Sequence, residues 1–265
     1  MKISNNLQMA KYLLSLLIKA NKKFKKLDIK VEEKDVHDLV TTMDTSIENF
    51  LIEKLLKTHP GIKIVSEEFN KKSTAKGTYF VIDPIDGTVN FANNLFNLWG
   101  IQIAYVENDV ILASAIYFPD TKNKFYSAKG FGSFKNGKKF VVKKKDPDRA
   151  LIGFNVHEID FQYKASKMLK KKVLKLRDVT TSCVNSYMMA EGQLGGVITN
   201  DGKPWDIIPG ILLMEEAGCL HKFIDGHHVI ASHEDTFKLL VETVAKCSSP
   251  VMKKAKLKTP AVKGL

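Results

Sequence analysis

The chain of 265 residues is poor in cysteine, in arginine and in long apolar runs. Its three cysteines, Cys183, Cys219 and Cys247, are too few and too scattered for a disulfide framework or a Cys-x-x-Cys metal site. The longest apolar runs span only about seven residues, which excludes a transmembrane helix. The N-terminal segment is amphipathic and has no small-residue cleavage site, so we expect no signal peptide. These absences predict a cytoplasmic protein in a reducing compartment.

The basic charge has an unusual composition. There are 41 basic and 29 acidic residues, which gives a formal net charge of +12, and only Arg149 and Arg177 are arginines. Lysine is a flexible, hydrated point charge and lacks the bidentate geometry with which arginine recognises phosphates and base edges. The lysines cluster in residues 22–26, 164–175 and 249–265, without the interleaved aromatic side chains of a single-strand binding surface. We interpret these clusters mainly as solvated surface, with nucleic-acid binding as an unfavoured alternative.

Apolar spacing in the first half predicts helices followed by strands. A helix is expected over residues 4–26, a polar loop over 30–38 and a second helix over 38–61, with Asp44 near its start as a candidate N-cap. Strands are expected over residues 62–68, 78–86, 98–108, 109–119 and 123–130. Tight turns are predicted at residues 107–109 and at Asn136-Gly137.

The second half mixes strands and helices. Strands are expected over residues 151–156, 176–179, 195–200, 219–226 and 227–233, and helices over 160–175, 181–192, 206–217 and 234–246. This order predicts an α+β fold of layered sheets and helices. We divide it into an N-terminal half (1–140), a C-terminal half (141–248) and a lysine-rich tail (249–265) that we expect to be disordered.

The segment FVIDPIDGTVNF, residues 80–91, carries the clearest chemical signal. An apolar strand ends in Asp83 and Asp86, and Gly87-Thr88 then allow a sharp turn into a helix whose N-terminal N–H groups can bind a phosphate. Two acids beside a phosphate require a divalent cation with oxygen ligands, for which Mg²⁺ is suited. Haloacid-dehalogenase phosphatases use a D-x-D-G-T motif with a covalent nucleophile, and the D-x-x-D-G-T spacing here argues against that route.

The motif FVIDPIDGTVNFAN resembles the first motif of the inositol monophosphatase family. The segments LVTTMD (39–44), IVSEE (64–68) and PWD (204–206) resemble three further family segments in the family's order, although Ser66 replaces the usual glycine before Glu67. The resemblance covers residues 5–245. It implies a layered αβαβα sandwich, a Mg²⁺-dependent and lithium-sensitive phosphomonoesterase, and a homodimer.

The resemblance also implies roles for individual residues. Two Mg²⁺ ions, with a weaker third near Glu67, would be held by Glu67, Asp83, the main-chain carbonyl of Ile85, Asp86 and Asp206. The implied catalytic residues are Asp44 and Thr88, which would orient and deprotonate the attacking water, together with Glu67. The implied phosphate- and substrate-binding residues are Asp86, Gly87, Thr88, Thr181, Ser182 and Asp206. Metal ions paired in this way can stabilise both oxygens of an in-line displacement at phosphorus.

Departures from the family pattern leave the substrate open. Thr180 stands where glycine is usual, Thr199-Asn200-Asp201 stand where inositol-selective members have a glutamate, and Ile207-Ile208-Pro209 replace small residues. We expect an inositol monophosphate-like polyol or sugar phosphate. Fructose 1,6-bisphosphate, a 3′-phosphoadenosine nucleotide and NADP are the alternatives. A nucleic-acid-binding or regulatory protein on the same fold is less favoured.

Overall fold

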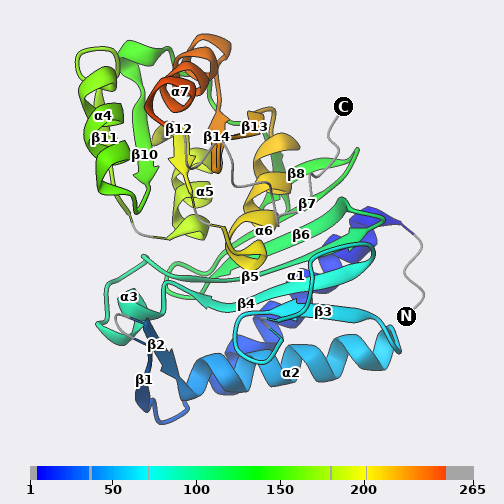
Figure 1. Cartoon of the computed structure of the whole chain (residues 1–265). Helices are drawn as coiled ribbons and strands as arrows, with labels where there is room; N and C mark the ends of the chain where they lie inside the picture. Colours follow the sequence, from blue (N-terminus) through cyan, green and yellow to red (C-terminus); the bar gives the residue numbers. More distant parts are fainter. Residues whose placement is uncertain (1–4, 36–37, 71, 180, 201, 249–265) are drawn as a thin grey trace.

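The computed structural model of the chain describes residues 5–35, 38–70, 72–179, 181–200 and 202–248. Its layers stack in the order helices, sheet, helices, sheet, helices (Figure 1). The predicted α+β fold with αβαβα layering is therefore confirmed. The predicted disorder of residues 249–265 concerns a segment outside the described residues. None of the helices described is long and apolar enough to span a bilayer.

The larger sheet has seven strands, hydrogen-bonded in chain order. They are β3 (Lys63–Ser66), β4 (Tyr79–Asp86), β5 (Gly100–Glu107), β6 (Val110–Phe118), β7 (Asn123–Ala128), β8 (Gly132–Lys135) and β9 (Lys138–Phe140). β3 and β4 are parallel, and each later pair is antiparallel. The predicted turn between β8 and β9 is confirmed, and both Asn136 (φ 50) and Gly137 (φ 84) adopt the positive φ that such a tight hairpin requires.

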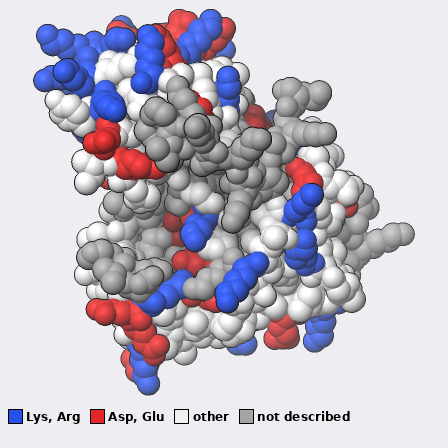
Figure 2. All heavy atoms as spheres, in the orientation of Figure 1, with Lys and Arg blue, Asp and Glu red and all other residues white. Residues whose placement is uncertain are grey.

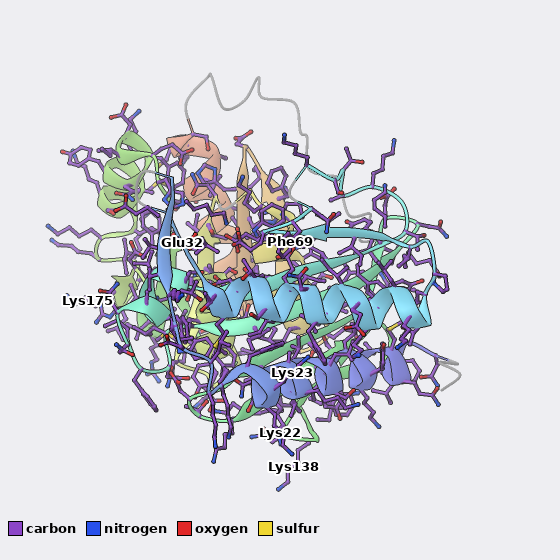
Figure 3. All side chains as sticks on the ribbon, turned by 90° about the horizontal axis from the view of Figure 1, so that it is seen from below. Lys22, Lys23, Glu32, Phe69, Lys138 and Lys175 are labelled. Atoms are coloured by element: carbon purple, nitrogen blue, oxygen red, sulfur yellow. The ribbon has the colours of Figure 1, made fainter. Side chains whose placement is uncertain are left out.

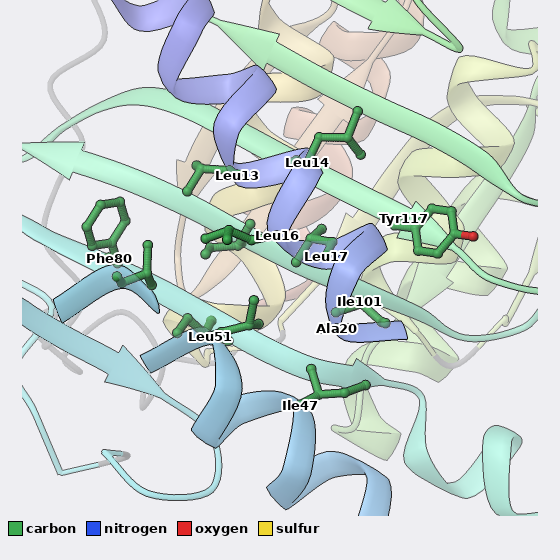
Figure 4. Packing of buried hydrophobic residues seen from close by; sticks show 14 of the residues in the cluster. Leu13, Leu14, Leu16, Leu17, Ala20, Ile47, Leu51, Phe80, Ile101 and Tyr117 are labelled. Atoms are coloured by element: carbon green, nitrogen blue, oxygen red, sulfur yellow. The ribbon is translucent and has the colours of Figure 1, made fainter. Parts of the chain in front are cut away.

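Two helices, α1 (Asn6–Phe24) and α2 (Thr42–Thr58), cover one face of this sheet and lie side by side in Figure 3. Their apolar side chains recur every three or four positions and so form one buried stripe on each helix. Figure 4 shows this core, in which the helices meet the sheet through Leu13, Leu16, Leu17, Ile47, Leu51, Phe80 and Ile101. The buried stripes fix α2 against the strands that end at the site described below.

The segment before α2 differs from the prediction. Residues expected to be a polar loop form an antiparallel pair, β1 (Val31–Asp35) and β2 (Asp38–Thr41), and α2 begins at Thr42 instead of residue 38. The error arises because main-chain hydrogen bonds hold this pair, while four of the five β1 residues are charged and Val31, Glu32 and Glu33 are exposed. The N-cap of α2 is Thr41, and Asp44 is the N3 partner of a capping box, so the expectation of Asp44 as N-cap is wrong.

The smaller sheet has five strands in the order β11-β10-β12-β14-β13, which are β10 (Leu151–Asn155), β11 (Lys175–Arg177), β12 (Leu194–Thr199), β13 (Leu220–Ile224) and β14 (His227–Ala231). Strands β11, β10 and β12 are parallel, whereas β14 is antiparallel to both β12 and β13. The larger sheet ends at Phe140 and the smaller begins at Leu151, on either side of the predicted boundary. The domain limits themselves stay a prediction.

The remaining helices fill the middle and outer layers of the molecule. Between the sheets lie α5 (Ser182–Ala190) and α6 (Pro204–Glu215), and on the outside lie α4 (Ile159–Leu169) and α7 (Glu234–Cys247) (Figure 1). Two short helices, α3 (Thr88–Ala92) and the 3-10 turn η1 (Pro147–Arg149), complete the chain. The helix expected to reach residue 175 ends at Leu169, because the chain turns there and Lys171 has a φ of 68.

Candidate functional site

A pocket opens where β4 ends and α3 begins. This carboxylate pocket has a volume of about 420 Å³ and is lined by Glu67, Asp83, Ile85, Asp86, Gly87, Thr88, Val89, Asn90, Thr181 and Asp206. It therefore contains every residue that the sequence nominated as a metal ligand. The lining comes from the end of β3, the β4–α3 turn, the start of α5 and the first turn of α6. Segments distant in sequence thus meet at one point between the two sheets.

Three carboxylates converge inside the pocket. Asp83, Asp86 and Asp206 each offer an oxygen within 4.8 Å of the others. Both oxygens of Asp83 are buried and have no hydrogen-bond partner among the described residues. Burial raises the pKa of Asp83 well above its usual range, and the nearby carboxylates of Glu67, Asp86 and Asp206 raise it further.

A buried carboxylate without donors is energetically unfavourable unless a cation compensates it. The donor set in the pocket consists of carboxylate and carbonyl oxygens, which are the ligands that Mg²⁺ prefers. The unpartnered oxygens of Asp83 therefore fit a bound divalent cation, with Asp86 and Asp206 as neighbouring ligands.

Asp86 is held in place by three donors from two elements, α5 and β5. Its Oδ2 accepts hydrogen bonds from the Cys183 N–H at 2.6 Å, Ser182 Oγ at 2.7 Å and Gln102 Nε2 at 3.1 Å. Ser182 Oγ also contacts the carbonyl oxygen of Asp206. These contacts fix one edge of the carboxylate and join the start of α5 to the acidic cluster. Because the Ser182 hydroxyl is engaged here, it supports Asp86, and its substrate-binding role stays a prediction.

Asp44 lies behind Thr88 and is fully buried. Thr88 Oγ1 donates to Asp44 Oδ1 at 3.0 Å and lies 2.9 Å from the Ile85 carbonyl oxygen. The other oxygen of Asp44 accepts from the Thr41 N–H at 2.8 Å and from the Thr41 hydroxyl. Burial raises the pKa of Asp44 to about 6, although the hydrogen bonds from Thr41 and Thr88 lower it. Asp44 is thus linked to the pocket through the Thr88 hydroxyl.

Glu67 follows β3 and reaches the pocket beside a lysine that the sequence did not nominate. Lys34 Nζ lies 3.2 Å from Glu67 Oε1 and 2.7 Å from Glu68 Oε1. Burial raises the pKa of Glu67 to about 7, and the Lys34 charge opposes this rise. Lys34 was missed because its strand was predicted to be a loop.

The turn after Asp86 can be made only by glycine. Gly87 has a φ of 94, and a Cβ at this position would lie 2.6 Å from Thr181 Cγ2 and 2.8 Å from the Leu98 carbonyl oxygen. Residue 87 is therefore packed closely against the Leu98 backbone and the Thr181 side chain at the pocket. The buried Thr181 Oγ1 has no hydrogen-bond partner among the described residues, and Thr181 lines the pocket.

Two further residues of the site could have been recognised from local signals. Gln102 is a polar residue within the buried run of residues 100–104 of β5, which is otherwise apolar, and such a residue often has a specific buried partner. Glu48 lies one helical turn after Asp44 on α2 and is fully buried. A buried acid on a helix that covers a sheet is unusual enough to indicate a specific role.

The positions expected to set substrate specificity are only partly described. Thr199 lines a small cavity next to the carboxylate pocket, together with Ser182 and Asp206. Pro209 is buried within α6 and is not among the described residues that line either cavity. Thr180 and Asp201 lie outside the described residues. Trp205 packs in the core between α6 and the larger sheet.

Several known proteins resemble this chain in sequence. The sequence profile of the inositol monophosphatase family matches residues 3–258. An inositol monophosphatase from Dictyostelium discoideum is 33% identical over 203 residues, which cover 71% of this chain and 73% of the relative. A fructose-1,6-bisphosphatase/inositol-1-monophosphatase from Aquifex aeolicus is 29% identical, over 73% of this chain and 75% of the relative. The Nus factor SuhB of Pseudomonas aeruginosa is 28% identical, over 85% and 90%.

Solved structures share the fold. A staphylococcal inositol monophosphatase-1 soaked in LiCl superposes with a TM-score of 0.80 at 23% identity, and the match covers 92% of this chain and 96% of that one. An IMPase/NADP phosphatase complexed with Mg²⁺ and phosphate gives a TM-score of 0.79 at 24% identity, over 90% and 95%. Profile, relatives and fold agree over nearly the whole chain. The chain therefore belongs to the inositol monophosphatase family and is a phosphatase.

Proposed function

We propose that the protein is a Mg²⁺-dependent phosphomonoesterase that hydrolyses a small anionic phosphate ester by attack of water. The observation that carries this proposal is the buried cluster of Asp83, Asp86 and Asp206, in which both Asp83 oxygens lack a described partner. Glu67, Asp83, the Ile85 carbonyl, Asp86 and Asp206 would hold two Mg²⁺ ions, or three with a weaker ion near Glu67. Bound Mg²⁺ supplies Lewis-acid stabilisation of the charge that develops during phosphoryl transfer.

The residues of the chain have separate tasks in this proposal. The N–H groups of Gly87 and Thr88 lie at the start of α3, where helix geometry leaves them without intrahelical acceptors, and they bind the phosphate oxygens. Thr181 lines the same pocket and offers its buried hydroxyl to the substrate. Asp206 lies in the first turn of α6, so the second half of the chain contributes this carboxylate to the proposed site.

Thr88 and Asp44 form the path for the proton. Thr88 Oγ1 can accept a proton from water while passing its own proton to Asp44 Oδ1, 3.0 Å away. A pKa of about 6 suits Asp44 to receive that proton near neutral pH, because a general base works best when its pKa lies close to the operating pH. Asp44 acts through the hydroxyl, since it is not among the described residues that line the pocket.

The pocket volume of about 420 Å³ suits a small molecule. A polyol or sugar phosphate resembling inositol monophosphate is the proposed substrate class. The segment Thr199-Asn200-Asp201 stands where inositol-selective members have a glutamate, which leaves fructose 1,6-bisphosphate, 3′-phosphoadenosine nucleotides and NADP as competing substrates. Thr199 lines the small cavity together with Asp206.

Phosphate release from these four classes and from β-glycerophosphate, measured with and without Mg²⁺, tests both parts of the proposal. We expect strong release from one substrate only when Mg²⁺ is present. Equal release in excess EDTA would refute the metal dependence. No release from any substrate by folded protein with Mg²⁺ would refute the substrate class.

Oligomeric state and location are part of the same proposal. We expect a homodimer, which light scattering coupled to size-exclusion chromatography would test against the monomer mass of 29.8 kDa.

We also propose a cytoplasmic location. All three cysteines are free and buried, which is compatible with a reducing compartment. Recovery of the native protein in the membrane fraction of its cell would contradict it.

A second candidate function rests on a basic surface. Lys164, Lys167, Lys170, Lys171, Lys172, Lys175 and Arg177 are all exposed, and Figure 2 shows Lys and Arg side chains gathered over α4 and the turn that follows. The similarity to the Nus factor SuhB makes RNA the acidic partner to test first. RNA binding should fall steeply with salt and weaken when residues 249–265 are removed. A Kd for RNA that is tighter than about 0.1 mM only at very low salt would indicate non-specific electrostatic attraction and refute this role.

A further inference from the structure

Glu48 is a buried acid whose carboxylate is saturated by protein donors. Its Oε1 accepts from the Ser66 hydroxyl at 2.5 Å and from the Phe69 N–H at 2.8 Å, and its Oε2 accepts from the Glu68 N–H at 2.9 Å. We name this set the Glu48 clasp: the Glu48 carboxylate, the Ser66 hydroxyl and the N–H groups of Glu68 and Phe69. It joins α2 to the segment that leaves β3, and Figure 3 shows Phe69 beside α2.

The residues that the Glu48 clasp holds are the sequence neighbours of Glu67 on both sides. Residues 66, 68 and 69 are bonded to one carboxylate, while the Glu67 side chain faces the carboxylate pocket and Lys34. A side-chain contact from Ser66 before Glu67 and two main-chain contacts from residues 68 and 69 after it restrict the backbone around Glu67, and the Glu67 side chain then varies mainly through its rotamers. The clasp therefore controls the point from which the Glu67 carboxylate enters the pocket.

Ser66 strengthens this link in a way that glycine could not. Its hydroxyl is fully buried and donates to Glu48, and it also accepts from Asn70 Nδ2 at 3.3 Å. The serine that departs from the family's usual glycine before Glu67 thus has a defined partner. It adds a side-chain hydrogen bond to two main-chain ones.

The same helix also supports the proton path. Asp44 and Glu48 are separated by one turn of α2, so both project from one face of the helix. Asp44 bonds to Thr88, and Glu48 bonds to the segment that carries Glu67. The position of α2 therefore couples the water-orienting pair to one of the proposed metal ligands.

We propose that Glu48 is a positioning residue that holds Glu67 in the geometry for binding a divalent cation, and that Ser66 is its auxiliary in this chain. The proposal rests on the proposed metal-binding function of the carboxylate pocket. Groups that orient a metal ligand without touching the metal typically change its affinity by about 10- to 100-fold when they are removed.

The test compares Glu48→Gln and Ser66→Ala with the control Glu53→Gln, which changes an exposed acid on the same helix that forms an ion pair with Lys54. Mg²⁺ affinity is measured without substrate, from the rise of Tm with Mg²⁺ concentration and from tryptophan emission, to which both Trp99 and Trp205, the neighbour of Asp206, contribute. We expect Glu48→Gln to weaken Mg²⁺ binding about tenfold, Ser66→Ala to weaken it about threefold, and Glu53→Gln to leave it unchanged. With Mg²⁺ saturating, kcat of Glu48→Gln should fall less than about threefold.

A double-mutant cycle with Glu67→Gln shows whether the effect passes through Glu67. In the Glu67→Gln background, Glu48→Gln should cause no further loss of Mg²⁺ affinity. A full additional loss would overturn the proposal. So would a lower Tm with unchanged Mg²⁺ affinity, because that result assigns Glu48 a purely structural role.

Two controls keep the outcomes separate. If Glu48→Gln does not fold, Ser66→Ala carries the same test, since it removes one hydrogen bond and leaves the carboxylate in place. If the unmodified protein shows no Mg²⁺-dependent change in Tm or emission, the proposed metal function fails together with this inference. If the unmodified protein binds Mg²⁺ and the variants bind it with the same affinity, the positioning role is refuted and the proposed metal function stands.

Discussion

The carboxylate pocket and the Glu48 clasp lie next to each other, and both bury acids, but they differ in what surrounds those acids. In the clasp, three donors satisfy the Glu48 carboxylate. In the pocket, Asp83 has no described donor and faces other carboxylates. Burial raises the pKa of both groups, but the hydrogen bonds to Glu48 counteract the rise, whereas the neighbours of Asp83 increase it.

The difference shows how one fold separates a supporting acid from an acid available to a ligand. Hydrogen bonds from N–H and O–H groups stabilise a buried charge permanently. An acid without them is unfavourable in the free protein and gains most from a bound cation. The Glu48 clasp thus fixes the segment that carries Glu67 on one side of the pocket, and the donors to Asp86 fix that carboxylate on the other.

The largest effect should come from removing the unpartnered charge. Asp83→Asn should lower turnover by at least about a thousandfold, because it removes the central carboxylate of the cluster proposed to hold Mg²⁺. The Tm of the metal-free protein should stay the same or rise, since a buried like-charge contact is lost. Both are measured by phosphate release and thermal unfolding with and without Mg²⁺, with the exposed Asp148→Asn as control. An active Asp83→Asn enzyme would end the metal proposal.

The wall of the pocket should be the next most sensitive feature. Gly87→Ala combines a strained φ of 94 with contacts of 2.6 Å and 2.8 Å, and should cost about 3 kcal/mol of the free energy of unfolding together with most of the activity. Gly61→Ala has a similar φ of 76 but open space around its Cβ, and should cost only about 1 kcal/mol. Chemical denaturation measures both. Equal costs would show that strain alone governs Gly87.

The effect of Mg²⁺ on stability should depend on pH. Glu67 (pKa about 7) and Asp44 (pKa about 6) have pKa values above their ordinary 4.5 and 3.8, so between about pH 4 and 7 the folded metal-free protein binds more protons than the unfolded chain. This contribution to stability is lost as the pH rises through that window, by on the order of 3 kcal/mol for Glu67.

Mg²⁺ needs the deprotonated ligands, so its stabilising increment should be small at pH 5 and large at pH 7.5. The difference between the Tm with Mg²⁺ and the Tm without it, measured at pH 5 and at pH 7.5, isolates the contribution of the metal-binding acids. The pKa values of His227 and His228 are lowered by burial, which destabilises the fold at low pH in both samples. An increment that is constant from pH 5 to 7.5 would contradict the raised pKa values.

The smallest effect is expected at Lys34. Its charge lowers the pKa of Glu67, so Lys34→Gln should raise that pKa further and move the pH midpoint of Mg²⁺ binding upward by less than about one unit. Lys54→Gln is the matched control, because Lys54 pairs with the exposed Glu53. Mg²⁺ titration at several pH values measures this midpoint. A downward shift in the Lys34→Gln variant would show that Lys34 acts in another way.

Much of the site was predictable because it is encoded in short segments. The run FVIDPIDGT placed Asp83, Asp86, Gly87 and Thr88 on one strand and turn, and the structure has β4 and α3 there. Lys34 and Gln102 were not predicted. A charged strand resembles a loop, and a polar residue in an apolar strand indicates a buried partner without showing which residue that partner is. The end of α4 was placed too late because a run of lysines is as compatible with a helix as with a turn.

By itself, the sequence determined the layered α+β class, the turn at Gly87 and the identity of the acids, because local spacing and residue chemistry carry that information. Only the tertiary structure decided which acids are satisfied. Whether Glu48 receives three donors and Asp83 none depends on how α2, β3 and β4 pack, since their partners are brought together by burial of the apolar core. Hydrogen-bond satisfaction between distant segments is a property of the packed fold, and here it separates the supporting acid from the acids proposed to bind metal.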